Sequence, residues 1–230
     1  MLTLDQLQKS FDKHQPVLRG VSLSLAPGEA VCIAGGNATG KTTLLRTACG
    51  LLVPDGGSVR CDGKIALVPQ EPALLPELTV RDNLKLWYAA QNLDSPTFSE
   101  ASPETQLGLS PFYKKRAGAL SGGMKKRLSI AAALAGSPDY LLLDEPFAAL
   151  DAPGCHTLST LLRRLKSAGM GILFTSHEPQ QIANLADALY LLQDGRLSTP
   201  LRLKELPEAQ RQHSILALLF SGHETSQEDF

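Results

Sequence analysis

The sequence has no apolar run that approaches the roughly 20 residues needed to cross a bilayer as a helix. It also lacks an excess of either charge, because 22 Lys and Arg face 23 Asp and Glu. That balance gives no electrostatic reason to expect nucleic acid or anionic lipid as a partner. The opening residues, MLTLDQLQKSFDK, lack the basic and then apolar layout of a secretory signal. We therefore expect a soluble cytosolic protein that binds no nucleic acid.

Cysteine is scarce, and its spacing argues against a zinc site or a disulfide framework. Cys32, Cys49, Cys61 and Cys155 form no C-x-x-C pair. Three of them fall in apolar or helical stretches, which predicts buried thiols in a reducing compartment.

The chain of 230 residues is long enough to bury a sizeable core. Alternating apolar residues in MLTLDQL and VLRGVSLSLAPG predict strands with one solvent-exposed face. The segment SVRCDGKIALVPQ (58–70) predicts a hairpin that leads into a core strand. Elsewhere, near-continuous apolar runs alternate with helical patterns, which implies a parallel sheet covered on both faces. The strands are expected at 29–35, 140–146 and 171–177, and the helices at about 41–52, 121–135, 155–167 and 179–186.

One segment interrupts this alternation. LTVRDNLKLWYAAQ has a helical pattern, and the Ser- and Pro-rich DSPTFSEASPET follows it. We therefore expect an inserted helical subdomain at about 78–138 within a domain spanning 1–200. Residues 201–230 are expected to form a short C-terminal extension.

A Gly-rich segment, GGNATGKTT (35–43), lies between an expected strand and an expected helix. Gly35, Gly40, Lys41 and Thr42 fill the pattern G-x-x-x-x-G-K-[ST]. The glycines let successive N–H groups turn toward one point, and the helix N-terminus adds a partial positive charge. Lys41 supplies a charge for the β- and γ-phosphates, and the Thr42 hydroxyl can ligate Mg²⁺. The segment therefore predicts a nucleotide site.

Polar residues end three apolar runs, at the sheet edge where ligands bind. Asp144 follows YLLL and is placed as a second Mg²⁺ partner, while Glu145 could polarise the attacking water. Gln70 ends IALVPQ and His177 ends ILFTSH. A lone Gln or His is usually structural, so their shared placement is what makes these two residues candidates.

The stretch LSGGMKKRL (120–128) offers a second seat for an anion. Ser121 can cap a helix there, and the two glycines after it leave the first amides uncovered. The basic run Lys125–Arg127 would suit the binding of a polyanion from another molecule. The alternative is that these three side chains are ordinary solvated cations on a helix face. The Gly-rich segment 35–43 is already expected to hold one triphosphate. We therefore expect the helix start at Ser121 to contact the triphosphate that is bound by a second copy of the protein.

In this order and spacing, GGNATGKTT, Gln70, LSGGM, YLLLDEP, ALD (149–151) and TSH resemble the ATP-binding subunit of ABC transporters. The resemblance extends to about residue 200, and LSGG ahead of LLLDEP is its specific part, since other P-loop proteins lack that element. It implies an α/β P-loop NTPase fold with a RecA-like core, an N-terminal antiparallel β subdomain and an inserted helical subdomain.

The resemblance also implies roles for single residues. Glu145, His177 and Gln70 would be catalytic, and Thr42, Gln70 and Asp144 would surround Mg²⁺. Phe11 would stack on adenine, although a core aromatic is the alternative. The residues implied to contact ATP are Phe11, Gly35, Gly36, Asn37, Ala38, Thr39, Gly40, Lys41, Thr42, Thr43, Ser121, Gly122, Gly123 and Asp151.

As a whole, the resemblance implies an ATPase that works with a transmembrane permease subunit and a second ATP-binding subunit on the cytoplasmic face of the membrane. Met124, followed by basic residues, looks more like the exporter-type (ABC-2-like) ATPases. A soluble ABC-type ATPase of a non-transport assembly complex is the alternative. Gly36 and Ala38 replace the family's usual proline and glycine, and we expect binding to survive both replacements.

Overall fold

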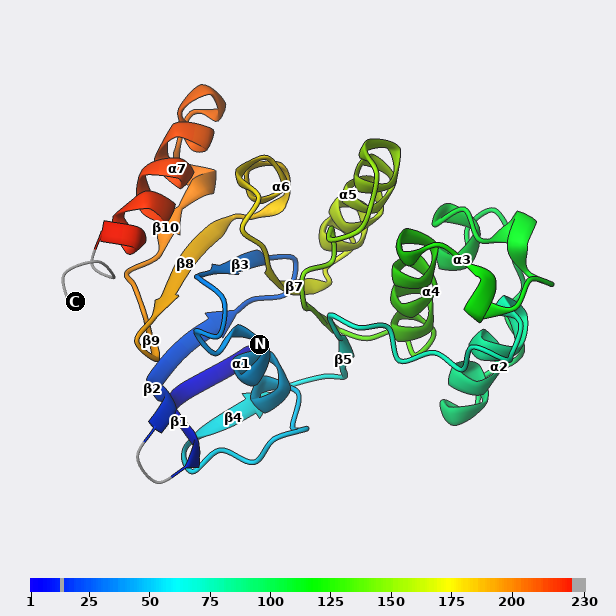
Figure 1. Ribbon diagram of the computed structural model, residues 1–230, viewed down its shortest axis with the longest axis horizontal. Helices are drawn as coiled ribbons and strands as arrows, with labels where there is room; N and C mark the ends of the chain where they lie inside the picture. Colours follow the sequence, from blue (N-terminus) through cyan, green and yellow to red (C-terminus); the bar gives the residue numbers. More distant parts are fainter. Residues whose placement is uncertain (13–14, 225–230) are drawn as a thin grey trace.

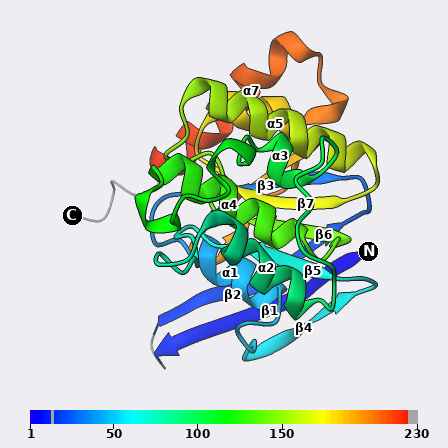
Figure 2. The same ribbon diagram turned by 90° about the vertical axis from the view of Figure 1, so that its right-hand side faces the viewer.

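Two sheets and the helices around them lie in layers in the computed structural model, which describes residues 1–12 and 15–224 (Figures 1 and 2). The smaller sheet is antiparallel, in the order β2-β1-β4, and consists of β1 (Leu2–Asp12), β2 (Gln15–Leu25) and β4 (Gly56–Cys61). Within the described residues the larger sheet has seven strands, in the order β10-β8-β3-β7-β6-β5, with β9 paired to β8. Its strands are β3 (Ala30–Ala34), β5 (Ile65–Val68), β6 (Tyr140–Leu143), β7 (Gly171–Thr175), β8 (Ala188–Gln193), β9 (Arg196–Leu197) and β10 (Leu201–Arg202).

The centre of the large sheet consists of short apolar strands. Every residue of β3, β6 and β7 is buried. β3 pairs in parallel with β7 and β8, and β6 pairs in parallel with β5 and β7. Continuous apolar runs suit strands that are covered on both faces. The α/β fold is therefore confirmed, with a sheet that is parallel from β8 to β5 and has antiparallel β9 and β10 beside β8.

The two faces of the large sheet are covered differently. The helices α5 (Ala152–Ser167), α6 (Pro179–Leu185) and α7 (Glu208–Glu224) lie over one face (Figure 1). The other face packs on α1 (Lys41–Ala48) and on the antiparallel sheet, so that Leu4 shares one buried cluster with Leu142. Helices thus cover one face, whereas a second sheet and a single helix cover the other.

The helical lobe stands beside the layers, at the right of Figure 1. It contains α2 (Val80–Ala90), α3 (Pro103–Gln106) and α4 (Gly122–Leu134), with 3-10 turns at Ser110–Phe112 and Ala117–Ala119. Leu84 of α2 and Leu128 of α4 belong to the same buried cluster as Leu141 of β6. This shared core fixes the lobe to the large sheet.

The hairpin predicted at residues 58–70 is wrong. β4 pairs with β1, whereas β5 pairs with β6 in the other sheet. Asp139 holds the chain where it passes from one sheet to the other, because its carboxylate accepts the N–H of Lys64 at 2.7 Å and its own N–H donates to the Lys64 carbonyl at 3.0 Å. A Cβ at Gly63 would lie 2.6 Å from the Asp139 carboxylate. The partner that decides this turn is therefore distant in the sequence.

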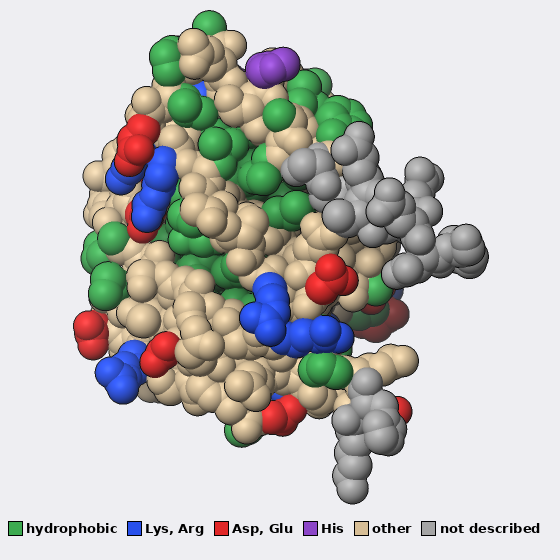
Figure 3. Space-filling view, turned by 90° about the vertical axis from the view of Figure 1, so that its left-hand side faces the viewer, with side chains coloured by type: hydrophobic (Ala, Val, Ile, Leu, Met, Phe, Trp, Pro, Cys, Tyr) green, Lys and Arg blue, Asp and Glu red, His purple; other side chains and the backbone are tan. Residues whose placement is uncertain are grey.

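The C-terminal extension takes part in the fold. β10 adds an antiparallel strand beside β8, a 3-10 turn follows at Leu203–Glu205, and α7 places Ile215 in the main core. Residues 225–230, with most of the acidic end, lie outside the described residues. Figure 3 views the side where α7 lies, and charged side chains of both signs are scattered over it.

Two expectations from composition can be compared with the structure. All four cysteines are free, but only Cys32 is buried, while Cys49, Cys61 and Cys155 are half-buried. The prediction of buried thiols, which was made for three of the four, therefore holds only for Cys32. Among the described helices, none has the length and apolar content needed to cross a membrane.

The buried strand β6 provides a test of this packing. Leu142 is 0% exposed, whereas Leu51, after α1, is 68% exposed. Because Leu142→Ala leaves a cavity between the two sheets, we expect the free energy of unfolding to fall by about 2–5 kcal/mol. The control Leu51→Ala should change it by less than about 0.5 kcal/mol. Urea unfolding of both variants measures the difference, and equal stability of the two would contradict the layered core.

Candidate functional site

The ends of four neighbouring parallel strands carry most of the predicted site residues. The order β3-β7-β6-β5 brings together the loop 35–40 after β3, His177 after β7, Asp144 after β6 and Gln70 after β5. A hollow of about 340 Å³ opens at this edge. The predicted residues that line it are Phe11, Asn37, Ala38, Thr39, Gly40, Lys41, Thr42, Thr43, Gln70, Asp144 and Glu145.

The loop between β3 and α1 is a tight turn with open amides. Gly40, the N-cap of α1, has a φ of 105° and makes no side-chain cap, so the first amides of the helix remain available. A Cβ at Gly35 would lie 2.5 Å from the Leu192 carbonyl oxygen. Ala38 has a φ of 62°, a left-handed conformation that costs about 1–2 kcal/mol for a residue with a Cβ. The loop therefore forms even though alanine replaces the family's usual glycine.

Lys41 lies across this loop. Its ammonium donates to the carbonyl oxygens of Gly35 and Gly36, at 2.8 Å each. The side chain is thereby held beside the uncapped amides of α1. One positive charge and several N–H donors face the same hollow, which is the chemistry that a phosphate group requires.

Asp144 is almost fully buried, at 3% exposed, and two hydroxyl groups satisfy its carboxylate. Thr42 of α1 donates to Oδ2 at 2.6 Å, and Thr175 at the end of β7 donates to Oδ1 at 2.8 Å. A hydroxyl and a carboxylate that already touch are hard oxygen ligands of the kind that Mg²⁺ prefers. These residues fit the metal that the sequence implied.

Glu145 occupies an unusual backbone position beside Asp144. Its φ is 47°, and non-glycine residues in this region store roughly 1–3 kcal/mol of strain. Its N–H donates to the Thr175 hydroxyl at 2.8 Å, and its Oε1 lies 3.3 Å from Nδ1 of His177. The Glu145 carboxylate thus faces the hollow and touches the exposed imidazole of the neighbouring strand.

Sequence reasoning missed Thr175, which bonds both Asp144 and Glu145. The signal was available, since a buried hydroxyl ends the apolar run of β7 one strand away from these carboxylates.

Phe11 lines the hollow and is 66% exposed. The alternative that Phe11 is a core aromatic is therefore wrong. Its exposed ring lies on the side of the hollow formed by β1, where a planar group could stack.

Seven predicted residues are not among those that line the hollow: Gly35, Gly36, Ser121, Gly122, Gly123, Asp151 and His177. Ser121 caps α4 by accepting the Met124 N–H at 3.3 Å, as expected. Asp151 caps α5 by accepting the Gly154 N–H at 2.9 Å. A Cβ at Gly123 would lie 2.9 Å from the Ala149 oxygen, so the start of α4 adjoins the segment before Asp151.

The basic run on α4 does not form the cluster that the sequence suggested. Lys126 is 3% exposed and donates to backbone carbonyls of its own chain. Arg127 donates to the Leu107 carbonyl and lies 3.7 Å from Asp151. Both alternatives, a seat for a polyanion and solvated cations, therefore fail for these two residues, because α4 turns them toward the protein interior.

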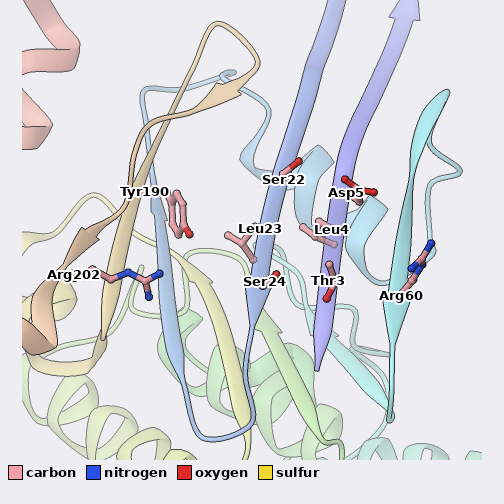
Figure 4. Close-up of a pocket in the computed structure, with 9 residues that line it drawn as sticks. All are labelled: Thr3, Leu4, Asp5, Ser22, Leu23, Ser24, Arg60, Tyr190 and Arg202. Atoms are coloured by element: carbon pink, nitrogen blue, oxygen red, sulfur yellow. The ribbon is translucent and has the colours of Figure 1, made fainter.

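A second hollow, of about 440 Å³, lies beside the antiparallel sheet (Figure 4). Thr3, Ser24 and Arg60 line it from the small sheet, and Tyr190 and Arg202 line it from the large one. Figure 4 shows the two arginines at opposite sides of the strands, and Arg202 already lies 3.6 Å from Glu29. Among its described lining residues there is none that the sequence predicted for a site.

Comparisons with known proteins agree with this geometry. A model of the family described as ABC transporter matches residues 18–148, more than half of the chain. The aliphatic sulfonates import ATP-binding protein SsuB of Corynebacterium glutamicum is 35% identical over 224 residues, covering 94% of this chain and 89% of that protein. The Nod factor export ATP-binding protein I of Burkholderia pseudomallei is 34% identical over 215 residues, covering 85% of this chain and 68% of that protein.

The fold is also found among solved structures. A dimeric ATP-binding cassette in a post-hydrolysis state, bound to ADP and Pi, matches with a TM-score of 0.79 at 26% identity. The match covers 88% of this chain and 99% of that one. Together with the matching family model, this likeness shows that the chain belongs to the ABC transporter family and forms its ATP-binding, ATP-hydrolysing domain.

Proposed function

We propose that the chain is the ATPase subunit of an ABC transporter, peripheral on the cytoplasmic face of the membrane, and that it powers transport through a separate permease subunit. One observation carries the proposal: the 2.6 Å contact between Thr42 and Asp144 at the wall of the hollow that the Gly-rich loop forms. The contact joins the phosphate cradle to the carboxylate pair, which are the two parts that phosphoryl transfer needs.

ATP binding follows from the groups around the hollow. The amides of residues 36–43 and the Lys41 ammonium would hold the phosphates, and the Phe11 ring would stack on adenine. Thr42, Asp144 and Gln70 would hold Mg²⁺. When bound, this ion neutralises charge on the β- and γ-phosphates.

Hydrolysis needs a group that orients and deprotonates water. Glu145 is proposed for that task, because its carboxylate borders the hollow next to the metal ligand Asp144. His177, which lies 3.3 Å from Glu145, would hold that carboxylate and contact the γ-phosphate. Gln70 would complete the water site from β5.

The proposal includes dimerisation. The Ser121–Gly123 segment begins a helix with open amides, yet it lies outside the hollow of its own chain. A second ATP-binding subunit, identical or different, would place its triphosphate against this helix start, with Asp151 beside it. The dimeric form of the solved ADP-bound cassette supports this arrangement.

The helical lobe has an exposed apolar surface that suits a permease. Leu75, Leu86 and Trp87 are 52%, 49% and 42% exposed, on and just before α2. The same segment, residues 72–91, follows Gln70 in the chain. A helix of the permease that docks here would be linked to the site through Gln70.

We propose export as the direction of transport. The support is the sequence resemblance of Met124 and the basic residues after it to exporter-type ATPases. Relatives named for import and for export are 35% and 34% identical, so overall likeness does not separate the two directions.

The role of Glu145 can be tested by Glu145→Gln. The amide keeps the shape of the side chain but cannot accept a proton, so the rate of hydrolysis should fall by about 10²–10⁴-fold while ATP still binds. With ATP the variant should sediment as a stable dimer. The control Glu208→Gln, on exposed α7, should hydrolyse ATP normally, and near-normal turnover by Glu145→Gln would exclude this carboxylate as the base.

Lys41→Ala tests the phosphate cradle. Loss of the ammonium should weaken ATP binding by about tenfold or more, because a hydrogen bond to a charged group is worth roughly 1.5–3 kcal/mol. Calorimetric titration with ATP measures the affinity. Lys64→Ala, at an exposed site after β4, serves as the control. Equal affinity in the two variants would remove Lys41 from the site.

The permease surface can be tested by co-purification from membranes of the cells that make the protein. Trp87→Glu should reduce recovery of the polytopic membrane partner by about tenfold, since buried aromatic anchors carry much of an interface's energy. Phe220→Glu is the matched control, because it replaces an aromatic side chain that is 65% exposed on α7. Equal recovery would contradict docking at α2. If the unsubstituted chain brings down soluble proteins alone, the assembly-complex alternative is favoured.

A further inference from the structure

Lys126 on α4 is a buried cation that the proposed chemistry does not use. Only 3% of the residue is exposed. Its ammonium donates to the carbonyl oxygens of Gln70 at 2.7 Å, Pro69 at 3.1 Å and Asp144 at 3.3 Å. An ammonium has three donors, so three carbonyls satisfy it fully.

Burial makes this side chain costly to keep charged. Removal from water lowers the pKa of Lys126, and the nearby carboxylates of Asp144 and Glu145 oppose that shift. A buried lysine is tolerated where its hydrogen bonds are complete, whereas an apolar replacement would leave three carbonyls without this donor. The position therefore has a specific geometric requirement.

The carbonyls that Lys126 contacts belong to the segments that carry the hydrolytic side chains. Pro69 and Gln70 follow β5, and Asp144 follows β6. The Asp144 carbonyl and the Glu145 N–H are the two ends of one peptide unit. Lys126 bonds the carbonyl end, and the Thr175 hydroxyl bonds the N–H end at 2.8 Å. This peptide unit is thus held from both sides.

The held peptide unit precedes a strained residue. The φ of 47° at Glu145 persists only where the surroundings enforce it. That angle decides where the Glu145 carboxylate points, and the bond to the Gln70 carbonyl holds the backbone from which the second side chain of the proposed water site projects. A small displacement of such groups lowers the rate steeply, because hydrolysis depends on alignment.

We propose that Lys126 is a positioning residue for ATP hydrolysis. Through its bonds to backbone carbonyls it holds the segments of Gln70 and Glu145 in a fixed position relative to α4. The inference rests on the proposed function of those two residues. Lys126 itself is not among the residues that line the hollow. Its loss should therefore change the rate of the chemical step and leave nucleotide binding largely intact.

Lys126→Met and Lys126→Arg test this inference against a matched control. Lys166→Met also removes a lysine that ties a helix to backbone, because Lys166 of α5 donates to the Leu185 carbonyl at 3.2 Å and to Asp187. Asp187 bonds the N–H of Ala30, at the start of β3 and away from the hollow. Lys166→Met should therefore lower the stability of the fold without displacing Gln70 or Glu145.

Steady-state ATP hydrolysis, ATP titration and thermal unfolding are measured for all variants. We expect kcat of Lys126→Met to fall by about tenfold or more while KM and ATP affinity change by less than about twofold. Lys126→Arg, which keeps the charge and the donors, should recover a substantial part of kcat. Lys166→Met should lose a similar amount of thermal stability with unchanged kcat.

Equal kcat in Lys126→Met and Lys166→Met at matched stability would show that Lys126 only supports the fold. If Lys126→Met does not fold, Lys126→Gln is judged by the same criteria, and failure of both neutral variants to fold overturns the inference. Absence of turnover in the unsubstituted chain would instead contradict the proposed function, and the inference with it.

Discussion

The site depends on one hydrogen bond, the 2.6 Å contact from the Thr42 hydroxyl to the Asp144 carboxylate. It joins the start of α1 to the end of β6, across β7, which lies between β3 and β6 in the sheet. A carboxylate that is 3% exposed must be hydrogen-bonded, and Thr175 of β7 provides the second bond. The hydrogen bonds of Asp144 therefore depend on the strand order, because a different strand between β3 and β6 would bring another side chain than Thr175 to this carboxylate.

Three non-glycine residues in the motif segments near this contact have strained backbone. Ala38, Glu145 and Ala149 have positive φ values although each carries a Cβ, and all three lie in segments that contain motif residues. Such angles need support from outside the segment. Glu145 receives it from Thr175 and Lys126 through the peptide unit shared with Asp144. The backbone geometry of the proposed catalytic Glu145 therefore depends on three elements, β6, β7 and α4, rather than on the motif alone.

The difference between what the sequence predicted and what it missed has a physical basis. The loop 35–43 and the carboxylate pair were predictable because their chemistry depends on neighbours in the sequence, and β3, β6 and β7 were predictable from their apolar runs. The crossing at Gly63 depends on Asp139, which is distant in the chain, so a local pattern could not identify it. Lys126 was misread for a related reason: a lysine within a basic run looks solvated until its partners at Gln70 and Asp144 are known.

Helix α4 connects the two parts of the proposed mechanism. Its first turn offers open amides away from the hollow, and its second turn contacts the segments that carry Gln70 and Glu145 through Lys126. Arg127 adds a contact with Asp151 at 3.7 Å and with the Leu107 carbonyl, while its own Nε is buried without a partner among the described residues. In the proposed dimer, a triphosphate at the first turn of α4 would thus lie on the same helix as Lys126, one turn from the contacts to the segments of Gln70 and Glu145.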